Sequence, residues 1–171
     1  LVGSEMCIRD RITGDDCIEY LEIILKNVKK SYLDQIVGRY IRLEKEDIIS
    51  SYFFDKENDK NITYDEIKSL ESYFHVCGTC TLYLKKLQVD IELKDVLIII
   101  SSDEKNAELT LNFPEKQFRD LEQNVLKENL HRLVLYLIQF CKCCEIHNWI
   151  LGYEPAEDND MKMIEWKESY F

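Results

Sequence analysis

Apolar residues recur at helical spacing in two long segments of the chain. The first segment follows the sequence TGDD, in which Asp15 and Asp16 suit the positive end of a helix. The second follows Pro114 and Glu115, a typical helix start, and keeps one apolar face for about eight turns. The apolar positions of the first segment are Cys17, Leu21, Ile24, Leu25 and Val28. We therefore predict two amphipathic helices, of which the second is the long one.

Two shorter segments have weaker helical patterns. Residues 31–46 place apolar side chains at helical spacing, although Gly38 and the β-branched residues weaken the prediction. In the sequence TYDE, Thr63 and Glu66 form a capping box, in which each residue satisfies a backbone donor of the other. This capping box predicts a short helix that ends near residues 77–80.

Elsewhere the apolar period changes to two, which is typical of strands with one buried face. The short connections Lys94-Asp95 and residues 101–106 suit antiparallel hairpins. Strands are predicted at residues 47–55, 87–93, 96–100, 107–113, 148–153 and 161–166. We therefore predict an α+β fold in one domain, residues 12–171, with an antiparallel sheet of about five strands covered by helices, including one long helix.

The composition is that of a folded chain with little linker. Of 171 residues, 46% are hydrophobic, and only 5 are Gly and 2 are Pro. The longest apolar run, residues 133–141, is about half the length of a bilayer-spanning helix. We expect a soluble protein that does not enter a membrane.

Charge restricts the choice of partners. The formal net charge is −11, so the surface repels phosphate backbones and nucleic-acid binding is excluded from the expected functions. The same charge favours either a basic protein partner or simply a soluble surface, and charge alone does not choose between the two.

The cysteines point to a reducing compartment. A chain with this apolar content does not need disulfide staples, and cysteines near a helix end behave as small apolar groups. We therefore expect thiols in the cytoplasm, at Cys17, Cys77, Cys80, Cys141, Cys143 and Cys144.

The first residues have a different origin in our interpretation. Read back into codons, residues 1–11, LVGSEMCIRDR, resemble the translation of a DNA sequencing adapter. We expect these residues to be a non-native scar, which removes Met6 and Cys7 from consideration as start site and thiol. The natural N-terminus, with any export signal, would then be missing.

Residues 55–66, DKENDKNITYDE, resemble the calcium loop of EF-hand proteins. Asp55 and Glu66 stand at the first and last ligand positions of such a loop. Lys60, however, stands where a glycine normally makes the sharp turn, and Glu57 replaces a shorter ligand. A solvated loop followed by a capping box explains Glu66 without a metal, and we favour it.

Cysteine and histidine spacing raises a second metal hypothesis. Cys77 and Cys80 have a spacing suited to zinc or redox chemistry, and Cys144 with His147 could complete a tetrahedral set. The two pairs lie far apart in the sequence, and the context of a redox motif is missing. We favour structural thiols and predict no cofactor, with a zinc- or calcium-binding regulator as the alternative function.

No motif of a known enzyme class is present. The sequence lacks G-x-S-x-G, a phosphate-binding glycine loop and H-E-x-x-H. We therefore expect a protein without catalytic residues.

One acidic segment stands beside aromatic residues. Negative charge can steer a basic partner toward the surface, and aromatic rings can anchor it. A loop kept polar for solubility is the alternative explanation. The predicted partner-binding residues are Trp149, Tyr153, Glu154, Glu157, Asp158, Asp160 and Trp166.

In size, acidity and predicted α+β layout, residues 12–171 resemble the small immunity proteins of bacterial polymorphic toxin systems. The segment ILGYEPAEDND is the most suggestive stretch. This resemblance implies stoichiometric binding to a basic toxin or effector, with no chemistry by the chain itself.

Overall fold

The computed structural model describes residues 19–55, 58–119 and 121–167. The predicted scar at residues 1–11, and Asp15, Asp16 and Cys17, lie outside the described residues. Within the described residues, no helix combines the length and the apolar character needed to cross a bilayer.

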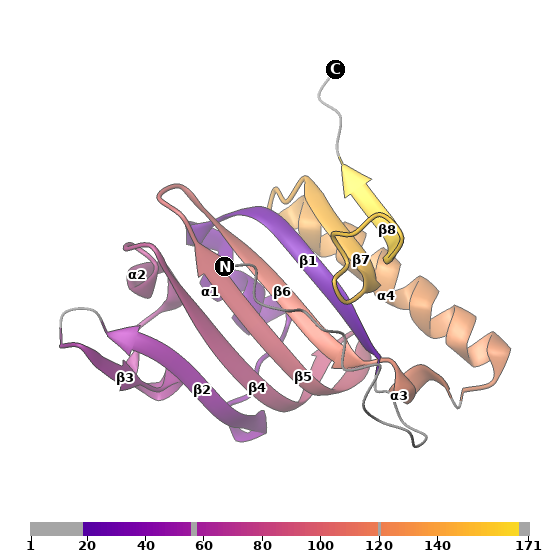
Figure 1. Ribbon diagram of the computed structural model, residues 1–171, viewed down its shortest axis with the longest axis horizontal. Helices are drawn as coiled ribbons and strands as arrows, with labels where there is room; N and C mark the ends of the chain where they lie inside the picture. Colours follow the sequence, from indigo (N-terminus) through magenta and orange to yellow (C-terminus); the bar gives the residue numbers. More distant parts are fainter. Residues whose placement is uncertain (1–18, 56–57, 120, 168–171) are drawn as a thin grey trace, which may run out of the picture.

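The described chain forms one antiparallel sheet with helices on one side, which confirms the α+β prediction (Figure 1). The sheet has eight strands rather than about five, in the order β3-β2-β4-β5-β6-β1-β7-β8. The strands are β1 Tyr20–Lys29, β2 Ile48–Asp55, β3 Lys60–Ile62, β4 Gly78–Val89, β5 Ile91–Ser102, β6 Asn106–Pro114, β7 Asn148–Tyr153 and β8 Lys162–Lys167.

The predicted first helix is wrong, because residues 20–29 form β1 between β6 and β7. Leu21 and Leu25 face the main core, whereas Ile24 is buried on the other face. The register then shifts between Leu25 and Val28, which returns Val28 to the core. Because both faces are buried and a bulge shifts the register, the spacing of apolar residues in β1 resembles that of a helix.

The predicted strand at residues 87–93 is also wrong, because a hairpin turn at Asp90 divides it between β4 and β5. Asp90 has φ 68°, and aspartate tolerates this left-handed conformation better than most residues do. Val89 and Ile91 flank the turn as cross-strand partners and are both buried. The apolar alternation therefore continues through the turn and conceals it. The predicted hairpin at Lys94-Asp95 lies instead within β5.

The long helix is α4, Gln123–Cys143, which buries Leu133, Leu137, Phe140 and Cys141. Its start was predicted too early, since Pro114 ends β6 and a separate short helix follows. Residues 30–40 form a continuous helical stretch of 3-10, α and π turns, which agrees with the helical pattern predicted there, whereas residues 41–44 are not helical. The capping box is confirmed at Thr63 and Glu66. The remaining helical segments are η2 Lys30–Tyr32, α1 Leu33–Gln35, η3 Ile36–Tyr40, η4 Lys45–Asp47, η5 Tyr64–Glu66, α2 Leu70–Tyr73 and α3 Lys116–Arg119.

The two faces of the sheet differ in what they contact. Helices α1 and α4 lie behind the sheet in Figure 1, and they bury its apolar residues in the main core. We call the opposite side the open face. On β1 the open face carries Glu22, Ile24 and Lys26, because side chains alternate along a strand.

Candidate functional site

The connection between β7 and β8 is fastened to the end of β1. The backbone N–H of Glu154 donates to the carbonyl oxygen of Tyr20 at 3.0 Å. The backbone N–H of Ala156 donates to Oε2 of Glu22 at 2.8 Å. Residues 154–161, which we call the β7–β8 loop, are therefore held against the open face of the sheet.

Apolar packing supports the same arrangement. Ala156 is fully buried and forms a small cluster with Ile24 and Ile150 on the open face. At the base of the loop, a Cβ on Gly152 would lie 2.5 Å from the carbonyl oxygen of Met161. Only glycine allows the two sides of the loop to approach this closely.

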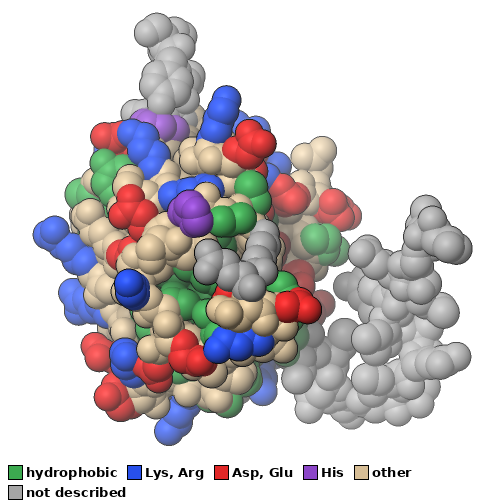
Figure 2. All heavy atoms as spheres, turned by 90° about the vertical axis from the view of Figure 1, so that its left-hand side faces the viewer, with side chains coloured by type: hydrophobic (Ala, Val, Ile, Leu, Met, Phe, Trp, Pro, Cys, Tyr) green, Lys and Arg blue, Asp and Glu red, His purple; other side chains and the backbone are tan. Residues whose placement is uncertain are grey.

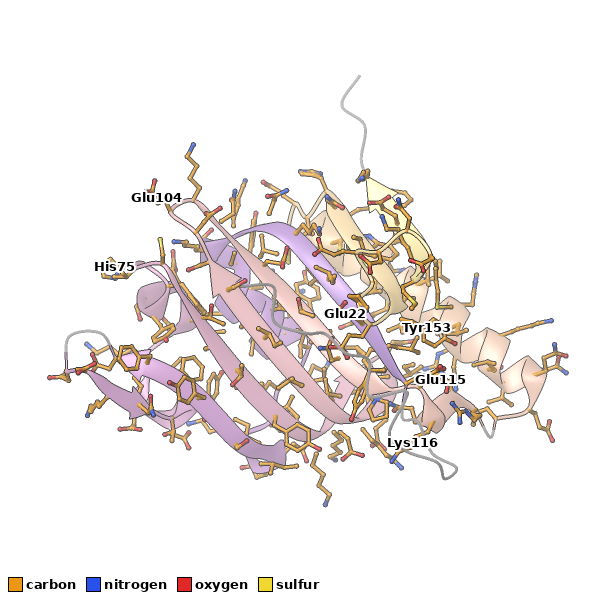
Figure 3. The ribbon with its side chains drawn as sticks, in the orientation of Figure 1. Glu22, His75, Glu104, Glu115, Lys116 and Tyr153 are labelled. Atoms are coloured by element: carbon orange, nitrogen blue, oxygen red, sulfur yellow. The ribbon has the colours of Figure 1, made fainter. Side chains whose placement is uncertain are left out.

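Four carboxylates gather around one cation at this place. Glu22 on β1 and Glu108 on β6 lie on the open face, and Glu154 and Glu157 extend from the β7–β8 loop (Figure 3 labels Glu22). The ammonium group of Lys26 forms an ion pair with Glu157. The site is therefore strongly negative.

Burial and mutual repulsion change the titration of two of these groups. Burial raises the pKa of Glu22 above its usual range, the hydrogen bond from Ala156 opposes this, and the charges of Glu154, Glu157 and Glu108 raise it further. Burial also raises the pKa of Glu108, against the lowering effect of Lys26. The negative charge of this surface is thus only partly compensated within the protein.

The acidic residues singled out from the sequence are all exposed: Glu154, Glu157, Asp158 and Asp160. The aromatic residues are placed differently. Trp166 on β8 is 38% exposed, and Tyr153 is half-buried on the helix side, where burial raises its pKa. Trp149 is only 1% exposed, directly opposite Trp166 across the two strands. Its expected place in a binding surface is therefore corrected to a place in the core.

Sequence reasoning missed the contributions of Glu22, Lys26 and Glu108. These residues come from β1 and β6, far from the β7–β8 loop in the sequence. The alternation of Glu22, Ile24 and Lys26 would have placed them on one face, had the segment been interpreted as a strand.

The two metal hypotheses gain no support from the geometry. Across residues 19–55, 58–119 and 121–167, no three His, Cys, Asp or Glu side chains are arranged to hold a metal ion. Burial raises the pKa of Cys80 to about 12 and that of Cys144 to about 11, which disfavours the thiolates that zinc binds. The carboxylate of Glu66 accepts hydrogen bonds from the backbone and hydroxyl of Thr63. The capping box thus already occupies this carboxylate.

A cleft of about 570 Å³ lies near the turn between β4 and β5, beside α3 and α4. Its acidic and basic side chains are mixed, and Arg132 donates to both the carboxylate and the carbonyl oxygen of Asp90. Lys116 also lines this cleft (Figure 3). The cleft therefore lacks the concentrated charge of the β7–β8 loop.

The sequence matches the family model described as PABL017 Cdi1I immunity protein over residues 19–169. The chain belongs to the PABL017 Cdi1I immunity protein family. The match spans β1 to β8, and therefore includes the whole sheet, α4 and the β7–β8 loop. The resemblance to immunity proteins of toxin systems is thereby confirmed.

A solved structure shares the fold of this Cdi1I-family chain. It is a chain of the 1.75 Å crystal structure of the toxic C-terminal tip of CdiA from Pseudomonas aeruginosa in complex with immune protein. The TM-score is 0.65 at 16% sequence identity, over 89% of this chain and 97% of that chain. No curated protein sequence matches the chain significantly.

Proposed function

We propose that this Cdi1I-family protein neutralises the toxic C-terminal domain of a CdiA-type protein by binding it stoichiometrically. The observation that carries the proposal is the family match over residues 19–169. The similar fold in a CdiA toxin complex supports it. The protein itself transforms no substrate and needs no cofactor in this proposal.

The proposed partner is basic, and it contacts the surface around the β7–β8 loop. Exposed carboxylates attract an oppositely charged protein and accelerate encounter, while the exposed Trp166 and the half-buried Tyr153 anchor it after desolvation. The hydrogen bonds to Tyr20 and Glu22 hold the loop in place before binding, which lowers the entropic cost of association. The proposed contact residues are Tyr153, Glu154, Glu157, Asp158, Asp160 and Trp166.

We further propose that residues 12–171 act as one domain in the cytoplasm. The main core joins residues from β1 to β7 with α4, which supports a single folded unit. Cys80, Cys141 and Cys144 are buried thiols, as expected in a reducing compartment.

Co-expression tests the proposal. The toxic C-terminal domain of a CdiA-type protein is expressed in bacteria with and without the chain, and growth is followed. We expect rescue of growth and a one-to-one complex by size-exclusion chromatography with light scattering. Continued toxicity in the presence of folded protein, or the absence of a complex, would contradict the proposed function.

A further inference from the structure

We infer that the open face beside the β7–β8 loop receives an arginine side chain of the toxin. In this inference the guanidinium lies between the carboxylates of Glu22 and Glu108 and donates a hydrogen bond to Oδ1 of Asn112. The inference rests on the proposed function and adds a specific contact point to it.

Asn112 is the observation that points to a ligand. Its side chain is only 6% exposed, yet within residues 19–55, 58–119 and 121–167 no group donates a hydrogen bond to Oδ1. A buried acceptor without a donor lowers stability, because the water that it lost on burial is not replaced by another hydrogen bond. Natural proteins rarely retain such a group, and where they do, a bound water, ion or ligand often satisfies it.

The sheet register directs Asn112 toward the carboxylate cluster. Asn112 on β6 is the direct cross-strand partner of Glu22 on β1, so the two side chains share the open face. Glu108 lies on the same face of β6, because residues 108 and 112 are separated by an even number of positions. In the inferred complex the guanidinium lies along β6, where Glu22 and Asn112 are side by side and Glu108 is four positions away on the same face.

The electrostatics favour a cation at this point. The charges of Glu108, Glu154 and Glu157 each oppose ionisation of Glu22. Lys26 is held by Glu157, so the cluster of four carboxylates keeps an excess of negative charge. An incoming cation would relieve this repulsion.

A guanidinium fits the acceptors better than an ammonium group does. Arginine presents five N–H donors in a planar fork, and it can bind a carboxylate and a neighbouring amide oxygen together. The inference requires neighbouring side chains to change rotamers when the guanidinium enters, as interface side chains commonly do on binding.

Two variants test the contact through different groups. Asn112→Leu removes the unsatisfied acceptor while keeping a similar volume. Glu22→Gln with Glu108→Gln removes two charges, and the side-chain amide oxygen introduced at position 22 can still accept from Ala156. The matched control is Glu71→Gln with Glu104→Gln, which removes two exposed charges elsewhere. Glu104 lies away from Tyr153 in Figure 3, and the end of the sheet at β2, β3 and α2 mixes acidic and basic side chains in Figure 2.

Binding of the purified toxin domain is measured by calorimetry together with urea unfolding of each free variant. We expect Asn112→Leu and the Glu22/Glu108 variant each to weaken binding about 10- to 100-fold, as for a hydrogen bond to a charged group. We expect Asn112→Leu to leave the urea midpoint unchanged or to raise it. The control should bind as tightly as the unaltered protein.

Three outcomes would overturn the inference. The first is unchanged affinity in both variants while the unaltered protein still binds the toxin, which leaves the proposed function intact. The second is an equal loss in the control, which would indicate only a general charge effect. The third is additivity of Asn112→Leu with every arginine substitution in the toxin in double-mutant cycles. Absence of binding by the unaltered protein would instead contradict the proposed function, and the inference with it.

Discussion

The carboxylate of Glu22 accepts a hydrogen bond of 2.8 Å from the backbone N–H of Ala156, and this contact joins the end of β1 to the β7–β8 loop. This contact restrains the loop and with it the positions of the loop's acidic residues. A surface that is ordered before binding loses less conformational entropy on association. In the proposed function, this restraint would let the four exposed carboxylates of the loop act as a specific surface.

Neutralising the loop should slow encounter with the toxin. We expect the combined variant Glu154→Gln, Glu157→Gln, Asp158→Asn and Asp160→Asn to reduce the association rate about 10-fold or more at low salt. The reduction should shrink as salt is added, because ions screen the exposed charges. Stopped-flow mixing at several salt concentrations measures this effect. Unchanged association rates at low salt would locate the encounter surface on another part of the protein.

Substituting Gly152 should disturb the base of the loop. A Cβ at this position would lie 2.5 Å from the carbonyl oxygen of Met161, so we expect Gly152→Ala to cost about 1–3 kcal/mol of folding stability. Gly38→Ala is the matched control, since no atom lies within 4 Å of a Cβ there and alanine favours helical backbone. Urea unfolding should show loss in the first variant and none in the second. Equal urea midpoints for the two variants would mean that the loop accommodates the added methyl group without loss of stability.

Alanine substitutions at Trp149 and Trp166 should affect folding stability and toxin binding differently. Trp149→Ala removes a side chain that is 1% exposed, and we expect a loss of about 3–5 kcal/mol. Trp166→Ala alters a side chain that is 38% exposed, and we expect at most about 1 kcal/mol. In contrast, Trp166→Ala should weaken toxin binding, which calorimetry on the folded variant measures. Full affinity in Trp166→Ala would remove this residue from the proposed surface.

The raised pKa of Glu22 should be visible in the pH dependence of stability. A carboxyl group whose pKa is higher in the folded than in the unfolded protein destabilises the fold when ionised, and this cost disappears as pH falls. We therefore expect Glu22→Gln to be more stable than the unaltered protein at pH 7. The difference should shrink toward pH 4, measured as urea midpoints across this range of about three pH units.

Glu66→Gln is a control variant for which we expect the opposite change in stability at pH 7. Hydrogen bonds from Thr63 lower the pKa of Glu66, so its ionised form stabilises the folded protein. This variant should lose stability at pH 7, and the loss should shrink as pH falls through the lowered pKa. If both variants changed the stability in the same direction at pH 7, the assigned environment of Glu22 would be wrong.

Local sequence patterns predicted several elements well. The alternation in residues 107–113 predicted strand β6, which buries Ala107, Leu109, Leu111 and Phe113 in the main core. The strand predicted at residues 148–153 is β7, which buries residues on both faces. The residue pair Thr63 and Glu66 predicted its capping box, because both partners lie within one turn of the chain. The charge of residues 154–160 was also evident without a structure.

The sequence by itself determined the α+β class, the long apolar face of α4 and the acidity of the β7–β8 loop, since these depend on neighbouring residues and on period. Only the tertiary structure decided that residues 20–29 form a central strand, because burial on both faces and a bulge hide the period of two. It also decided that Trp149 is internal and that Glu22, Glu108 and Asn112 adjoin the loop. Strand pairing brings these groups together, and the local sequence around one residue does not indicate which residue pairs with it across the sheet.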